Sequence, residues 1–234
     1  GFTPFEAEMI IFAKNLGIKT IAIDVNYDNL TSTGKLMRKT DRLAVWNERM
    51  AKEARELHGY RDDNITIIGP IRFDHYFTDE SDPYFRSRDE FLRSKGLNPE
   101  KKTIVYAGPT PSNYPPRREF MLELLRLRRE KKVIGDPNIL VRLHPNDSYA
   151  LYREFENTPG LHIERAGRQV RSDAGGGQKI EMDAKDFINL TETMKYADVV
   201  LNFASTIIIE ACLFDTPVIN VAFPSYRGVV YEYE

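Results

Sequence analysis

The feature that most constrains the fold is the stretch ADVVLNFASTIIIEACLFDTPVINV, residues 197–221. An apolar strand pattern over residues 198–203 leads through a short polar turn into an apolar helical segment that ends at Phe214. Residues 215–217 (DTP) break the helix, and residues 218–221 form a second strand. A crossover of this length joins parallel strands, so the stretch predicts a βαβ unit.

Ser205 and Thr206 lie where the first strand of this unit passes into the helix. Unpaired N–H groups and the positive end of the helix dipole attract anions such as phosphate at this place. Glu210 follows about 7 Å further along the helix axis, a separation that suits the two hydroxyls of a ribose. The structural alternative is a serine N-cap with a solvated glutamate beside it.

The composition excludes several classes of protein. A length of 234 residues allows one large domain or two small ones, and a net charge of −2 gives no support for nucleic-acid binding. The single cysteine, Cys212, cannot form a disulfide framework, which indicates a reducing, cytoplasmic compartment. No apolar run has the length of a transmembrane helix, and no signal peptide is visible. Because the chain begins inside a helical pattern and stops without a closing element, we expect a fragment of a longer enzyme.

Helical and strand patterns alternate along the chain, which predicts an α/β protein with two parallel-sheet units. The first series comprises a helix over 5–16, a strand over 20–24, a loop over 25–39, a strand over 41–46, a helix over 47–57 and a strand over 64–68. The second comprises strands over 103–107, 138–143, 161–164 and 198–203, helices over 117–131, 147–156 and 191–196, and a glycine-rich mobile insertion over 167–185. Between them, residues 71–98 carry one predicted helix over 89–95 and read as a connection.

Polar groups follow three strands of the second series, where a parallel sheet binds its ligands. Gly108-Pro109-Thr110 offers a flexible turn, residues 142–145 (RLHP) offer a guanidinium and an imidazole, and residues 202–206 offer two hydroxyls. These donors suit a diphosphate. The alternative for His144 alone is a satisfied structural histidine.

The first series offers weaker candidates. Asp24 or Asp28 could act as a base or bind hydroxyls, although a turn built from Asp and Asn explains them equally. His75 could face a cleft between the units or cover one of them. The four histidines lack metal-ligand spacing and the carboxylates are dispersed, so we expect no metal and no cofactor.

Several short stretches together resemble the GT-B glycosyltransferase superfamily, most of all CDP-glycerol glycerophosphotransferase-like and capsular-polysaccharide transferases. UDP-N-acetylglucosamine 2-epimerases are similar in scaffold and in the Ser…Glu turn. The similar stretches are Val45-Trp46-Asn47 with the following helix, residues 67–74 (IIGPIRFD), residues 141–145 (VRLHP), residues 197–221, and the loop over 27–31 (YDNLT), which has Tyr where surface-polysaccharide relatives carry Trp.

The resemblance implies two Rossmann-like units that face a cleft, as in GT-B enzymes. Residues 1–75 would be the C-terminal part of an incomplete first, acceptor-side domain, residues 76–100 the connection, and residues 101–234 a donor-binding domain truncated at its C-terminus. Such enzymes move a glycosyl or glycerophosphoryl group from a CDP-, UDP- or GDP-linked donor to a cell-surface glycan or polyol. They work in the cytoplasm, in some cases at the inner face of the membrane through segments that this chain lacks.

The resemblance also implies roles for single residues. Ser205 and Thr206 would hold the donor diphosphate, and Glu210 would reach the ribose. His144 and Arg142 would contact phosphate, while Gly108 and Thr110 would line the donor pocket. No catalytic base is identified, with Asp28 and His75 as weak candidates. A sugar-nucleotide 2-epimerase and a non-catalytic nucleotide-binding fragment remain the alternatives.

Overall fold

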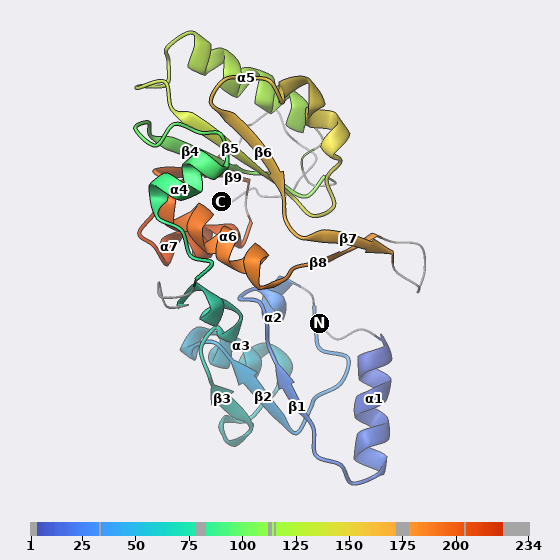
Figure 1. The fold of residues 1–234 in the computed structure, drawn as a ribbon. Coiled ribbons are helices and arrows are strands. Elements are labelled where there is room, and N and C mark those ends of the chain that lie inside the picture. Colours follow the sequence, from blue (N-terminus) through green and yellow to red (C-terminus); the bar gives the residue numbers. More distant parts are fainter. Residues whose placement is uncertain are drawn as a thin grey trace. The chain divides into compact units, whose positions relative to one another are not determined.

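The structure, a computed structural model, divides into two compact units at residues Gly1–Asp74 and His75–Glu234 (Figure 1). It describes residues 4–32, 34–77, 83–111, 114, 116–171, 178–203 and 205–221. None of the helices in these ranges is both long enough and apolar enough to cross a membrane. Each unit contains its own parallel sheet, as the alternation of patterns predicts.

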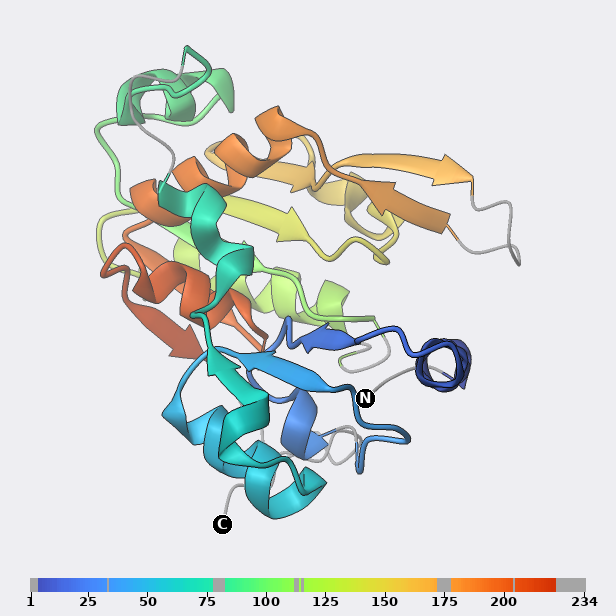
Figure 2. The same ribbon diagram turned by 90° about the horizontal axis from the view of Figure 1, so that it is seen from below.

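The first unit is built on a three-stranded parallel sheet in the order β1-β2-β3 (Figure 2). Its elements in chain order are α1 (Pro4–Asn15), β1 (Ile21–Ile23), α2 (Asn29–Ser32), β2 (Arg42–Val45), α3 (Glu48–His58), the 3-10 turn η1 (Asp62–Asn64), β3 (Ile65–Ile67) and the 3-10 segment η2 (Ile71–Phe77), which runs across the unit boundary.

Local sequence explains where α3 begins and ends. The Asn47 side chain accepts the backbone N–H of Met50 at 3.0 Å, and Gly59 adopts the left-handed conformation that ends the helix. His58 is buried: its Nε2 lies 2.7 Å from the Leu30 carbonyl, and its Nδ1 accepts the N–H of Leu36. This histidine therefore ties the segment after β1 to α3.

The prediction of a continuous loop over residues 25–39 is wrong in one place. Residues 29–32 form the single helical turn α2, because the Asp28 carbonyl accepts the N–H groups of Thr31 and Ser32. Asp24 supports the turn, since its Oδ1 accepts the Asn29 amide at 2.8 Å. A stretch rich in Asp and Asn can thus form a helical turn as readily as a loop.

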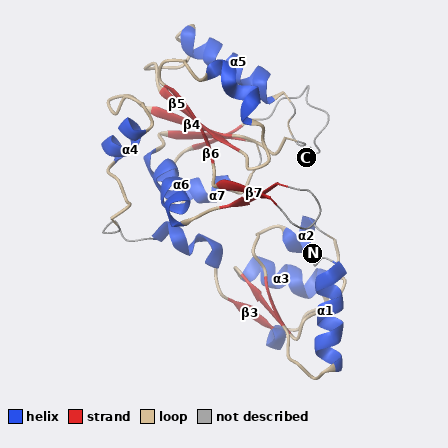
Figure 3. Ribbon diagram, turned by 45° about the vertical axis from the view of Figure 1, so that its right-hand side comes forward, coloured by secondary structure: helices blue, strands red, loops and turns tan. Residues whose placement is uncertain are grey.

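The second unit is built on a five-stranded parallel sheet in the order β10-β9-β4-β5-β6 (Figure 3). Its elements are α4 (Arg88–Ser94), β4 (Thr103–Ala107), α5 (Arg117–Arg129), β5 (Asn138–Leu143), the 3-10 segment η3 (Tyr149–Phe155), β6 (Leu161–Arg165), β7 (Arg168–Arg171), β8 (Gln178–Glu181), α6 (Ala184–Tyr196), β9 (Val199–Asn202), α7 (Ile207–Cys212) and β10 (Val218–Asn220). The predicted βαβ unit is present as β9-α7-β10, with Asn220 paired to Asn202.

The order of the strands reverses at β4. The chain adds β5 and β6 on one side of β4 and then returns to add β9 and β10 on the other. Counted from β4 as the first strand, this is the 3-2-1-4-5 order of a doubly wound Rossmann-type sheet, and its switch point lies between β4 and β9.

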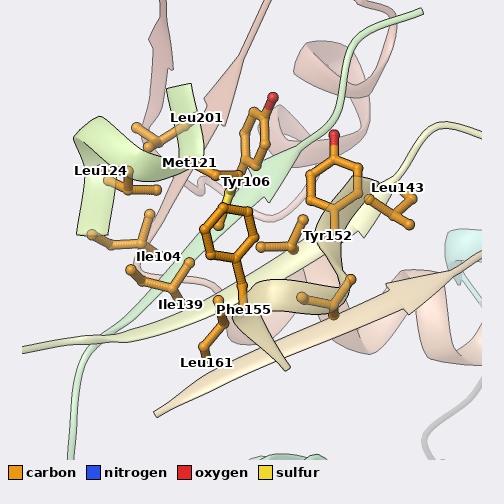
Figure 4. Close-up of a cluster of buried hydrophobic side chains, with 12 residues drawn as sticks. Ile104, Tyr106, Met121, Leu124, Ile139, Leu143, Tyr152, Phe155, Leu161 and Leu201 are labelled. Carbon is orange, nitrogen blue, oxygen red and sulfur yellow. The ribbon is translucent and has the colours of Figure 1, made fainter. Parts of the chain in front are cut away.

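The core of this unit lies between the sheet and α5 with η3 (Figure 4). Tyr106, Ile139 and Val141 point to this face from the central strands and are fully buried. The opposite face of the sheet carries α6 and α7, while α5 lies across from them (Figure 1). Helices on both faces explain why every residue of β4 and β5 is buried and the two strands are mostly apolar without alternation.

Two predictions in the second unit are wrong. Residues 168–181 include the antiparallel hairpin β7-β8, so the glycine-rich insertion is partly ordered, and its residues 172–177 lie outside the described ranges. Helix α6 begins at Ala184 under an Asp183 capping box, seven residues before the predicted start of the helix at residue 191. Thr191 instead lies inside the helix and donates its hydroxyl to the Phe187 carbonyl.

The segment predicted as a connection packs on α6. Glu192, which is fully buried, accepts the Arg86 backbone N–H at 2.6 Å and also forms an ion pair with the Arg86 guanidinium. The Tyr196 hydroxyl donates to the Arg86 carbonyl at 2.5 Å. Residues 83–94 are therefore part of the second unit.

We predict that the stability of the second unit depends on the β5 side chains inside the sheet. Ile139→Ala should lower the free energy of unfolding by about 2–5 kcal/mol, because the side chain is fully buried and leaves a cavity. Ile134→Ala provides the matched control, since Ile134 is 94% exposed, and should change stability by no more than about 0.5 kcal/mol. Urea unfolding would measure both, and equal losses would contradict this core assignment.

Candidate functional site

The candidate site lies at the carboxyl ends of β4, β5 and β9, where the strand order reverses. In open α/β sheets ligands bind in the crevice outside such a switch point. The loops that follow the three strands carry the residues predicted from the sequence, namely Gly108 and Thr110, His144, and Ser205 and Thr206.

Gly108 allows the ends of β4 and β5 to approach closely. Its N–H donates to the Arg142 carbonyl at 2.9 Å. A Cβ atom at this position would lie 3.2 Å from the Arg142 oxygen and 3.3 Å from the His144 nitrogen, so a side chain would press the two backbones apart by a few tenths of an ångström. Glycine therefore suits the close packing at the site.

Thr110 and His144 meet across this junction. The Thr110 hydroxyl lies 3.3 Å from His144 Nε2, while His144 Nδ1 accepts the N–H of Asn146 at 3.1 Å. A nitrogen that accepts carries no proton, so the neutral imidazole holds its proton on Nε2 and presents it as a donor beside Thr110. Partial burial lowers the pKa of His144 below its ordinary value, and nearby Asp147 opposes that shift.

The turn after β5 is held by a buried carboxylate that sequence reasoning missed. Asp147 is fully buried, forms an ion pair with Arg117 at 3.0 Å and accepts the Tyr152 hydroxyl at 2.8 Å. Arg117 also donates to the Pro111 and Tyr114 carbonyls, each at 3.0 Å. These contacts fix the loop after β4 against the turn after β5 and so position the Thr110–His144 pair. The only sequence signal was the polar HPND turn at 144–147.

An aromatic contact joins the loops after β4 and β9. The rings of Tyr114 and Phe203 lie 4.2 Å apart, and Phe120 meets Phe203 edge-on at 5.0 Å. Such pairs add to the stability that burial supplies. The loop that leads toward Ser205 is therefore anchored beside the loop that carries Thr110.

The turn before α7 differs in detail from the prediction. Ser205 is exposed and Thr206 is partly exposed, and Thr206 takes helical backbone angles without a capping bond from its side chain. Helix α7 ends at Cys212 and not at Phe214, so it is short. Ala204 lies outside the described residues. Two hydroxyls at a strand-to-helix turn are present, but the helix dipole behind them is small.

The charged groups of Arg142 and Glu210 are engaged elsewhere in the unit. Arg142 is buried and donates to Glu164 of β6 at 2.7 Å, so a phosphate contact would have to share or replace that ion pair. Glu210 is also buried and accepts a hydrogen bond from the Tyr76 hydroxyl. A ribose contact would compete with this bond.

The two weak catalytic candidates have structural partners. The carbonyl of Asp28 starts the α2 turn, while its buried Oδ1 has no hydrogen-bond partner among the described residues. His75 packs against Tyr76 at 3.9 Å and Phe187 at 4.8 Å, so it covers the second unit. Within the ranges that the structure describes, no three His, Cys, Asp or Glu side chains gather as a metal site requires.

Comparison with known families gives a match over most of the chain. Residues 8–161 match the sequence model of the family described as CDP-Glycerol:Poly(glycerophosphate) glycerophosphotransferase. The chain belongs to this family. The match contains Gly108, Thr110 and His144 and ends before Ser205 and Glu210. No curated protein matches the chain.

Solved structures share its fold. UDP-GlcNAc 2-epimerase from Neisseria meningitidis bound to UDP-GlcNAc is 13% identical with a TM-score of 0.62, covering 97% of this chain and 59% of that chain. The S. aureus MnaA-UDP co-structure is 13% identical with a TM-score of 0.61, covering 95% and 57%. The wall teichoic acid polymerase TagF is 17% identical with a TM-score of 0.48, covering 83% and 44%.

The likeness to the epimerases confirms the Rossmann-like α/β fold with parallel sheets, and the family match confirms the resemblance to glycerophosphotransferases. The chain spans less than half the length of the TagF chains and about 59% of the epimerase chains.

We predict that His144 is neutral near pH 7 and titrates below 6.5. With its pKa lowered in the folded state, the unfolded chain binds the proton first as the pH falls. The stability that this group contributes is therefore present above pH 6.5 and is lost as the pH falls below it. Histidine NMR titration would give the pKa directly, and urea unfolding across this range would give the stability.

The control for this titration is His144→Gln. This variant should show a smaller loss of stability over the same pH range than the unmodified chain, because one of the groups responsible is gone. An equal loss in both proteins, or a midpoint for His144 above 6.5, would contradict the assignment.

Proposed function

We propose that this chain is the part of a glycerophosphotransferase that binds the nucleotide-activated donor, with the donor phosphates held at the switch point of the second unit. The observation that carries the proposal is the Thr110–His144 pair at the ends of β4 and β5, inside the segment that matches the glycerophosphotransferase family. The family description supports CDP-glycerol as the donor and a poly(glycerophosphate) chain as the acceptor.

The reaction requires donors for negative charge. An acceptor hydroxyl attacks the phosphorus next to glycerol, the bond from that phosphorus to the bridging oxygen breaks, and CMP leaves with the electron pair. The acceptor gains the glycerophosphoryl group and gives up its proton to a base, for which Asp28 and His75 stay our candidates. His144 Nε2–H and the Thr110 hydroxyl would donate to the phosphate oxygens as charge builds up on them.

Other residues complete the proposed site. Ser205 and Thr206 would add hydroxyl and backbone donors from the loop after β9, and Gly108 lets the loops after β4 and β5 approach each other closely. Arg142 and Glu210 would take part only if a ligand draws them from Glu164 and Tyr76. We expect the transfer to proceed without a metal, in the cytoplasm and at the inner face of the membrane.

Two alternatives differ in chemistry. The fold of the UDP-GlcNAc 2-epimerases, matched over most of this chain, favours a sugar-nucleotide epimerase as the second candidate. A third candidate is a segment that binds nucleotide without turnover. Glycosyl transfer, a variant of the first proposal, would break the bond to the sugar carbon and release a nucleoside diphosphate.

Nucleotide binding provides the first test. We expect calorimetric titration to show binding of CDP, with UDP and GDP as comparisons, and His144→Ala to weaken it about tenfold or more because a donor to charged oxygen is lost. Thr110→Ala and Ser205→Ala should weaken binding less.

The matched control is Thr158→Ala, because Thr158 is also partly exposed but lies before β6, at the opposite end of the strands. It should bind as the unmodified chain does. If no nucleotide binds, or if His144→Ala binds normally, the donor site is wrongly placed.

The released nucleotide distinguishes the reactions. With CDP-glycerol and a glycerophosphate acceptor, we expect CMP and a lengthened acceptor, measured by chromatography and mass spectrometry. Release of CDP would contradict glycerophosphoryl transfer, and conversion of UDP-GlcNAc without nucleotide release would identify an epimerase. Nucleotide binding with none of these products would identify a non-catalytic segment.

A further inference from the structure

A second polar cavity lies in the same unit, beside the edge strand β6 and the start of α6. Its volume is about 490 Å³. The charged and titratable groups in its wall are Arg86, Lys95, His162, Glu164, Arg165, Lys185 and Asp186. Thr110, His144 and Ser205 are not among its lining residues.

Glu164 is the centre of the charge cluster behind this cavity. The carboxylate accepts hydrogen bonds from Arg142 at 2.7 Å, Lys95 at 2.5 Å and the Asn189 amide at 3.0 Å. The side chains of Arg142, Lys95 and Glu164 are only 6%, 12% and 9% exposed. Two largely buried cations thus share one carboxylate, which leaves a buried excess of positive charge.

The other acidic groups near the cavity are already engaged. Glu192 forms its ion pair with Arg86. The Asp186 carboxylate accepts the Asp183 N–H at 3.0 Å in the capping box of α6. A backbone hydrogen bond leaves the charge of Asp186 in place. The lining cations Arg86, Lys95, Arg165 and Lys185 still exceed the lining carboxylates Glu164 and Asp186 by two charges.

Two further cations border the cavity. Arg165 donates Nη2 to the Asp147 carbonyl at 2.5 Å, and its buried Nε has no hydrogen-bond partner among the described residues. Lys185 is exposed, and its ammonium lies 4.9 Å from the centre of the Tyr84 ring. Buried positive charge without enough carboxylates is costly unless an anion approaches it.

We propose that this cavity binds a phosphate-bearing anion at a site separate from the donor site. Arg165 supplies a planar guanidinium, and Lys95 and Lys185 supply ammonium groups, a combination that suits the tetrahedral oxygens of a phosphate mono- or diester. The volume accommodates a phosphate together with a small polyol group. This proposal does not depend on nucleotide binding at His144.

The His162 imidazole provides a local probe for this proposal. It lines the cavity, with Nε2 3.8 Å from Glu164, and burial lowers its pKa. A bound anion would stabilise the imidazolium and raise that pKa. We would titrate histidine-labelled protein with inorganic phosphate at constant ionic strength and follow His162 and His144 separately by NMR. The expected result is a saturable shift of the His162 signals and an upward shift of its pKa.

Two charge-reversal variants distinguish binding of phosphate in this cavity from a general effect of the protein's net charge. Lys185→Glu should weaken phosphate binding, read at His162, by about tenfold. Lys195→Glu makes the same charge change on the same helix, and Lys195 also lies over an aromatic ring, that of Phe85 at 5.2 Å, but outside the cavity. It should leave binding unchanged. Equal effects of the two variants, or no response at His162, would overturn the proposal.

The source of the phosphate is decided by comparing ligands. Glycerol 3-phosphate and a short glycerol phosphodiester oligomer would be titrated in the same way. Tighter binding of the oligomer would assign the cavity to a phosphodiester chain, and tighter binding of the monoester would assign it to a small phosphate metabolite. If neither moves His162, the cavity is not a phosphate site.

Discussion

The parallel pairing of β4 with both β5 and β9 is the constraint on which the second unit depends. The chain starts this sheet at β4, adds β5 and β6 on one side and then returns to add β9 and β10 on the other, so the loops after β4 and β9 diverge beside each other. The hydrogen bond from the Gly108 N–H to the Arg142 carbonyl holds the ends of β4 and β5 together. A side chain there would move the His144 backbone away from β4 by a few tenths of an ångström, which would lengthen the Thr110–His144 contact.

A buried ion pair, Asp147 with Arg117, holds the loops after β4 and β5 in place. Asp147 carries no exposed surface, and Arg117, Tyr152 and the Ser148 N–H satisfy its carboxylate. A buried ion pair is weak evidence of net stability but strong evidence of fixed geometry, because removal of one partner leaves an uncompensated charge. The unit uses this device again at Glu192 and, with an extra cation, at Glu164. The surplus at Glu164 distinguishes a cluster that could receive an anion from two that only brace the fold.

Much of the fold followed from residue patterns. The boundaries of β4 and β5 matched the prediction because each is a mostly apolar segment buried on both faces. Asn47 and Gly59 located α3 through cap chemistry. Helix α6 was misjudged because Asp183 and Asp186 cap each other inside a charged, glycine-containing stretch that resembled a loop. The hairpin β7-β8 was missed for the same reason.

The sequence by itself determined which polar residues follow each strand, since strand ends are marked by local pattern. Only the tertiary structure decided which of them meet. It paired Thr110 with His144 through strands adjacent in space, and it turned Arg142 toward Glu164 and Glu210 toward Tyr76. Side chains on one strand alternate between the faces of the sheet, and their partners come from distant segments. The sequence pattern shows the alternation along a strand, but it carries no information about which distant segment supplies each partner.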